Sequence, residues 1–72
     1  MDKIIITRAM CFRQPSGDVI ELTEGLVRDS YTSQRICGHR IVEALFGQNK
    51  KSATKTFDLW VKFERKIGSK QL

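Results

Sequence analysis

Apolar residues recur at every second position along the first part of the chain, the period typical of β-strands. The pattern covers residues 3–13, where Arg8 interrupts it, and resumes over residues 19–23. Between the two segments lies Gln14-Pro15-Ser16-Gly17, in which proline fixes one turn angle and glycine suits the last turn position. Residues 3–24 therefore predict a β-hairpin that ends at Glu24-Gly25.

A helical period replaces the alternation in the middle of the chain. Over residues 33–46 the apolar side chains gather on one side of a helical wheel and most charged ones lie opposite. Gly38 fits less well, because glycine inside a helix costs about 1 kcal/mol relative to alanine. Gly47 has the position of a glycine that ends a helix. We expect a helix over residues 33–46. Three residues are equally suited to cap its start: Ser30, Thr32 and Ser33.

The segment over residues 55–67 fits both periods. As a strand, it turns Phe57 and Phe63 toward the core and Trp60 toward solvent. As a helix, it places all three aromatic residues on one apolar arc, and Arg65-Lys66 before Gly68 is then a typical helix end. We expect the strand, because the alternation and the aromatic content favour it.

Together these elements predict an α+β fold of order β-β-α-β, with about three antiparallel strands and one helix packed on a face of the sheet. The 72 residues make a single small domain, 1–72. We expect residues 68–72 to be a flexible basic tail. A chain this short buries only about 60% of its unfolded surface, so pairing with a second copy would be a simple way to gain stability.

The sequence favours a cytoplasmic protein without a membrane segment. Its longest apolar runs fall far short of the roughly 20 residues that cross a bilayer, and its first residues lack the apolar stretch of a signal peptide. The chain has two cysteines, Cys11 and Cys37, whereas a small secreted domain held by disulfides usually has four or more. We therefore expect free thiols in a reducing compartment.

The net charge of +5 comes from the last third of the chain. Residues 1–47 hold six basic and six acidic side chains, whereas residues 48–72 hold seven basic and two acidic ones. Clustered cations bind nucleic-acid phosphates and release their counterions, and an exposed Trp60 could stack on an unpaired base. The alternative is that the lysines only keep the protein soluble and that Trp60 lies in the core or at a dimer contact. The candidate residues for contact with DNA or RNA are Lys50, Lys51, Lys55, Trp60, Lys62, Arg65, Lys66, Arg35 and Arg40.

Metal, cofactor and catalytic sites have weaker signals. Cys37-Gly38-His39 places a thiol near an imidazole, with Cys11 as a conceivable third ligand, but the ligand spacings of closed zinc sites are absent. The sequence also lacks a glycine-rich phosphate loop and the motifs of common hydrolases. We expect no metal, no cofactor and no enzymatic activity. A remote alternative is a small nuclease-like toxin that uses His39.

Binding of a protein is the main alternative to binding of nucleic acid. A short sheet with an unpaired edge can accept a strand from another chain, so the partner would be a host protein or a second copy. The opening MDKIIITRAMCFRQPSGD, with the small size and the basic C-terminal part, resembles small, uncharacterised accessory proteins encoded by lambdoid prophages of enteric bacteria. The resemblance implies a phage-borne regulator or a host-directed inhibitor, and hence a binding protein rather than an enzyme.

Overall fold

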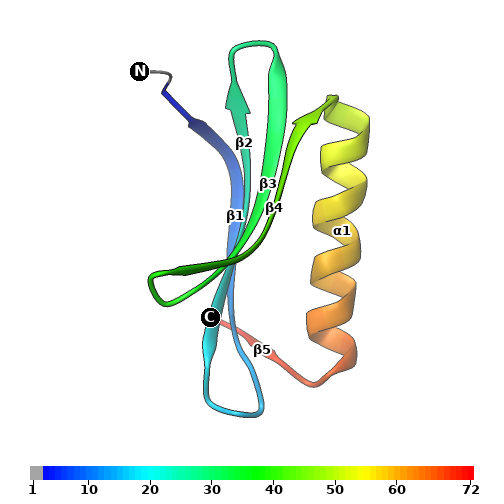
Figure 1. Cartoon of the computed structure of the whole chain (residues 1–72). Helices are drawn as coiled ribbons and strands as arrows, with labels where there is room; N and C mark the ends of the chain where they lie inside the picture. The colour runs from blue at the N-terminus through cyan, green and yellow to red at the C-terminus, as the bar shows by residue number, and fades with distance from the viewer. Residues whose placement is uncertain (1–2) are drawn as a thin grey trace.

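The computed structural model describes residues 3–72 and has two layers, a curved five-stranded antiparallel sheet and one helix that lies on one of its faces (Figure 1). The strand order across the sheet is β4-β3-β2-β1-β5. The first four strands follow one another as a meander, and the helix then leads back to the β1 edge, where the last strand pairs. The elements are β1 (Ile5–Arg13), β2 (Val19–Val27), β3 (Ser30–Cys37), β4 (Arg40–Gln48), α1 (Lys50–Lys66) and β5 (Lys70–Gln71).

The predicted first hairpin is confirmed, but its expected end at Glu24-Gly25 is wrong, because β2 continues through these residues to Val27. Strands β1 and β2 pair over most of their length, with Phe12 opposite Ile20. In the turn between them, the Gly17 N–H donates to the Gln14 carbonyl at 2.8 Å. Gly17 has a φ of 94°, a left-handed conformation that glycine adopts without steric cost. The turn chemistry and the period of two therefore identified this element correctly.

The fold is α+β in the general sense, but the predicted order β-β-α-β with about three strands is wrong. The chain forms β-β-β-β-α-β with five strands, and the expected helix over residues 33–46 is divided between β3 and β4. Gly38 explains the error, because its φ of 64° allows it to form with His39 a two-residue turn that reverses the chain. The apolar residues on either side of this turn then belong to two antiparallel strands.

The expected strand within residues 55–67 is also wrong, because residues 55–66 lie inside α1 and Ile67 is its C-cap. The helix begins at a well-formed cap: the backbone of Asn49 is extended, and its side-chain Oδ1 accepts a hydrogen bond from the Ser52 N–H at 2.8 Å. It ends before Gly68, which has a φ of 89°. Lys50, Lys51 and Lys55 therefore lie in the first two turns of a helix.

Replacing Asn49 with alanine removes the acceptor at the start of α1. We expect this variant to lose about 1 kcal/mol in free energy of unfolding, as caps of this kind typically do. Urea unfolding followed by circular dichroism measures the change. The control is Asn49→Ser, which keeps a capping oxygen and should retain nearly the full stability. Equal losses in both variants would show that the cap is not the cause.

The last residues return to the sheet. The sequence predicted a flexible tail over residues 68–72, whereas the structure has β5 pairing there with the end of β1. Beyond β5, the Leu72 N–H donates to the Cys11 carbonyl at 2.9 Å. The segment after α1 is thus held against the β1 edge.

The apolar core between the sheet and α1 is small. Its flanks are covered by Met10, Trp60 and Val61, which are only partly buried. With so few buried residues, each one carries a large share of the stability. The buried apolar residues are Phe12, Ile20 and Leu22 from the sheet and Ala53 and Phe57 from the helix.

A fully buried carboxylate, that of Glu64 on α1, lies beside this core. Its Oε1 accepts hydrogen bonds from Gln14 Nε2 at 3.1 Å and from Ser69 Oγ at 2.8 Å. The guanidinium of Arg35, on β3, lies 3.7 Å from its Oε2. Because these partners come from three parts of the chain, Glu64 holds the C-terminal half of the helix in place on the sheet.

Candidate nucleic-acid interface

The face of α1 that points away from the sheet carries a row of exposed cations. The opposite face is set by the buried residues Ala53, Phe57 and Glu64, which contact the sheet. At 3.6 residues per turn, the cations fall within an arc of about 100° and span about 22 Å along the helix. We call this row the basic stripe, and it consists of Lys51, Lys55, Lys62, Arg65 and Lys66, all of which are exposed.

One acidic residue, Asp58, lies within the arc of the basic stripe. Its Oδ1 is 3.2 Å from Nη1 of Arg8, which extends from β1. The same guanidinium stacks over the Phe57 ring at 4.0 Å and lies 3.8 Å from a Glu24 carboxylate oxygen. Arg8 therefore partly neutralises Asp58 from the side of the sheet, and the five cations of the stripe outnumber this one carboxylate.

Two of the other predicted basic residues lie apart from the stripe. Lys50 is exposed, but it lies about 100° around the helix from Lys51. Arg40 follows the turn between β3 and β4, which in Figure 1 points away from α1. The structure thus brings together five of the eight predicted cations and leaves Arg40 on a different surface.

Arg35 and Trp60 lie between the helix and the sheet. The exposed position expected for Trp60 depended on a strand, and on the helix its ring packs half-buried against the core. The guanidinium of Arg35 lies 5.9 Å from the Trp60 ring and forms ion pairs with Glu43, at 3.3 Å, and Glu64. Both residues hold the two layers together and are not available to stack on a base or to contact phosphate.

The cysteines and the histidine do not form a joint site. Cys11 and Cys37 are both free thiols, and His39 lies in the turn after β3. Burial, together with the neighbouring Glu21 carboxylate, raises the pKa of the Cys11 thiol, which weakens it as a nucleophile at neutral pH. Within residues 3–72 there is no group of three side chains that could hold a metal ion.

The sequence reasoning missed a second surface, the side of the sheet that α1 does not cover. We call it the open face. Large apolar residues are exposed on it, whereas in a one-sided antiparallel sheet the uncovered face is usually polar. The signal was present in the sequence as consecutive apolar residues within single strands, such as Ile4-Ile5-Ile6 and Leu45-Phe46, because neighbours along a strand point to opposite faces.

Comparison with known proteins places the chain in no family. No protein-family model, no curated protein and no solved structure matches it. In the described part of the chain, no helix is both long and apolar enough to cross a membrane. The fold and the two surfaces define a small α+β protein with a basic helix on one side and an apolar sheet face on the other.

Proposed function

We propose that the protein binds nucleic acid through the basic stripe and that it does so in the cytoplasm. The observation that carries the proposal is the alignment of five exposed cations on the helix face opposite the sheet. Such a surface contacts phosphates rather than base edges, so the binding is largely independent of sequence. A regulatory protein of the kind that the prophage resemblance implies would have use for such binding.

The local electrostatics of α1 support this proposal over a purely solubilising role. The helix begins with Lys50 and Lys51 and has no acidic residue in its first turn, although negative charge is favourable at this end. Lysines four residues apart, as at positions 51 and 55, also repel each other by a few tenths of a kcal/mol. The first two turns of the helix therefore carry an unfavourable charge arrangement that a bound polyanion would relieve, whereas Arg65 and Lys66 are favourably placed in its last turn.

The salt dependence of binding tests the proposal. If the five cations of the stripe each neutralise one phosphate, the logarithm of the binding constant should fall with the logarithm of salt concentration with a slope of about −4.5 on duplex DNA. Fluorescence anisotropy with labelled duplex DNA, duplex RNA and single strands measures this slope. Single strands should bind no more tightly than duplexes, because the tryptophan ring packs half-buried against the core and lies on the helix face opposite the stripe.

A matched pair of variants locates the contact. Lys55→Ala/Lys62→Ala removes two charges from the stripe and should reduce the slope by about 1.8. The control, Lys3→Ala/Arg40→Ala, removes two exposed charges elsewhere and should leave the slope nearly unchanged. The proposal fails if the unmodified protein does not bind at about 50 mM salt, where electrostatic binding is strong, or if both double variants lose the same affinity.

A further inference from the structure

The open face carries five large apolar side chains that are well exposed. Phe12, Ile20 and Leu22 point into the core, so Val19 points the other way. The register shift between Ile6 and Arg8 turns Ile6 and Ile4 to that same side, where Ile4 lies against Gly25. These side chains lie toward the two ends of the face, and the polar pair Thr23 and Gln34 lies between them. Exposed apolar groups of this size are typically contact sites. The exposed residues on this face are Ile4 at 45%, Ile6 at 55%, Val19 at 39%, Ile41 at 55% and Phe46 at 68%.

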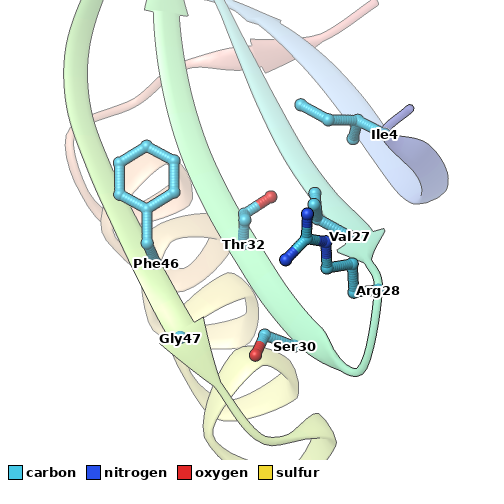
Figure 2. A pocket seen from close by; sticks show the side chains of 7 residues that line it. All are labelled: Ile4, Val27, Arg28, Ser30, Thr32, Phe46 and Gly47. Carbon is cyan, nitrogen blue, oxygen red and sulfur yellow. The ribbon is translucent and has the colours of Figure 1, made fainter. Parts of the chain in front are cut away.

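A pocket of about 410 Å³ lies at one end of this face (Figure 2). Its walls are Ile4, near the start of β1, and Phe46, near the end of β4, and Thr32 lies between them on β3. The ring of Phe46 stands away from its strand in Figure 2. The same end of the face therefore offers both an apolar recess and the most exposed large apolar side chain of the described chain.

We propose that two copies of the chain associate through their open faces, and that Phe46 of each copy enters the pocket of the other. A two-fold interface requires that one surface be complementary to itself, so that each contact occurs twice. The projecting Phe46 ring beside a recess lined largely by apolar groups meets that requirement. The two-fold rotation that relates the copies brings the ring of each copy to the recess of the other. Exposed aromatic anchors that enter pockets dominate the binding energy of protein interfaces.

The distribution of charge favours contact between two open faces over contact between two basic stripes. The charged strand residues of the described chain that point to the open face are Arg13, Glu21 and Lys70, which pairs with Arg13, and Arg28 lines the pocket. The open face therefore carries three cations and one carboxylate, and two such faces repel each other less than two basic stripes of five cations would. In such a dimer the stripes lie on the outside, and each remains free to contact nucleic acid.

The size of the face and the shape of the β4 edge agree with this arrangement. The two longer dimensions of the molecule, 36 and 24 Å, leave room on the face for the roughly 800 Å² that each partner buries in a standard interface. Edge-to-edge pairing through β4 is disfavoured, because its register with β3 is irregular at two points and Arg40 and Glu43 lie along it. Contact between faces therefore suits this molecule better than pairing through β4.

Sedimentation equilibrium of the full chain over a wide concentration range tests the proposal. We expect a monomer–dimer equilibrium that Phe46→Glu weakens by about 30-fold or more, the loss typical of an interface anchor. The matched control is Leu59→Glu, which adds the same charge at a residue of α1 that is 55% exposed, and it should dimerise like the unmodified protein. Because Phe46 is 68% exposed, its variant should fold normally, which circular dichroism verifies.

The alternative outcomes are distinct. A chain that stays monomeric at every concentration, or a Phe46→Glu variant that dimerises as tightly as the unmodified chain, overturns the proposal. Dissociation caused by Leu59→Glu instead would place the interface on the helix and overturn it as well. Dimerisation through apolar contacts should persist as the salt concentration is raised. The affinity for nucleic acid through the basic stripe should instead fall steeply. The failure of one proposal can therefore be distinguished from the failure of the other.

Discussion

Replacing Arg35 with methionine should destabilise the protein by about 3–5 kcal/mol, the range measured when one partner of a buried ion pair is removed. Glu64 is fully buried, and its remaining partners, Gln14 and Ser69, are neutral donors that do not balance its charge. A domain of 72 residues has a total stability of about 4–11 kcal/mol. The variant should therefore lie close to the threshold of unfolding.

Urea unfolding followed by circular dichroism and by the fluorescence of Trp60 measures this loss. The double variant Arg35→Met/Glu64→Leu should recover most of it, because apolar replacement of a whole buried pair is often neutral or stabilising. Glu43→Ala removes the exposed partner of Arg35 and should cost less than about 1 kcal/mol. A loss below about 1 kcal/mol for Arg35→Met itself would contradict the assigned role of the pair.

Replacing Phe57 with alanine should cost a similar amount, about 3–5 kcal/mol, because it removes a fully buried ring and leaves a cavity. Phe57 is the largest buried apolar residue that α1 contributes to the core, and it also carries the guanidinium of Arg8 on its face at 4.0 Å. Its removal should therefore loosen both the apolar contact and the cation–π contact between the helix and β1.

Phe63→Ala is the natural control, since Phe63 lies on the same helix but is 48% exposed. We expect it to cost about 1 kcal/mol or less. The midpoints of urea unfolding of the two variants, measured under the same conditions, compare them directly. Equal losses would show that the helix is not docked through Phe57 and would contradict the observed face of α1.

The sequence predicted the parts of the fold that local chemistry determines. The first hairpin followed from its period of two and from Pro15 and Gly17, whose backbone preferences do not depend on the rest of the chain. The middle of the chain failed because short apolar segments fit both a helix and a strand. Gly38 decided between them, because it adopts a left-handed conformation that reverses the chain. In a helical wheel the same glycine counts only as a weak helix former.

The candidate site was predicted in part for a related reason. The cations of the basic stripe were identified from charge alone, which does not depend on secondary structure. By contrast, the set of side chains that lie between the helix and the sheet depends on the secondary structure. Trp60 and Arg35 were therefore assigned to the surface, although both lie between the layers. The open face was missed because the apolar residues of β4 were attributed to a single helix stripe.

The order of the elements has a consequence for synthesis on the ribosome. Strands β1 to β4 are neighbours both in sequence and in the sheet, so the meander can form from local contacts. The nine residues from Asn49 to Phe57 take about 0.5–2 s to add at about 5–20 residues per second. During that interval the nascent sheet exposes Phe12 and Leu22 on one side and Phe46 on the other. The chain is most prone to aggregate in those seconds, before Phe57 arrives to cover its core.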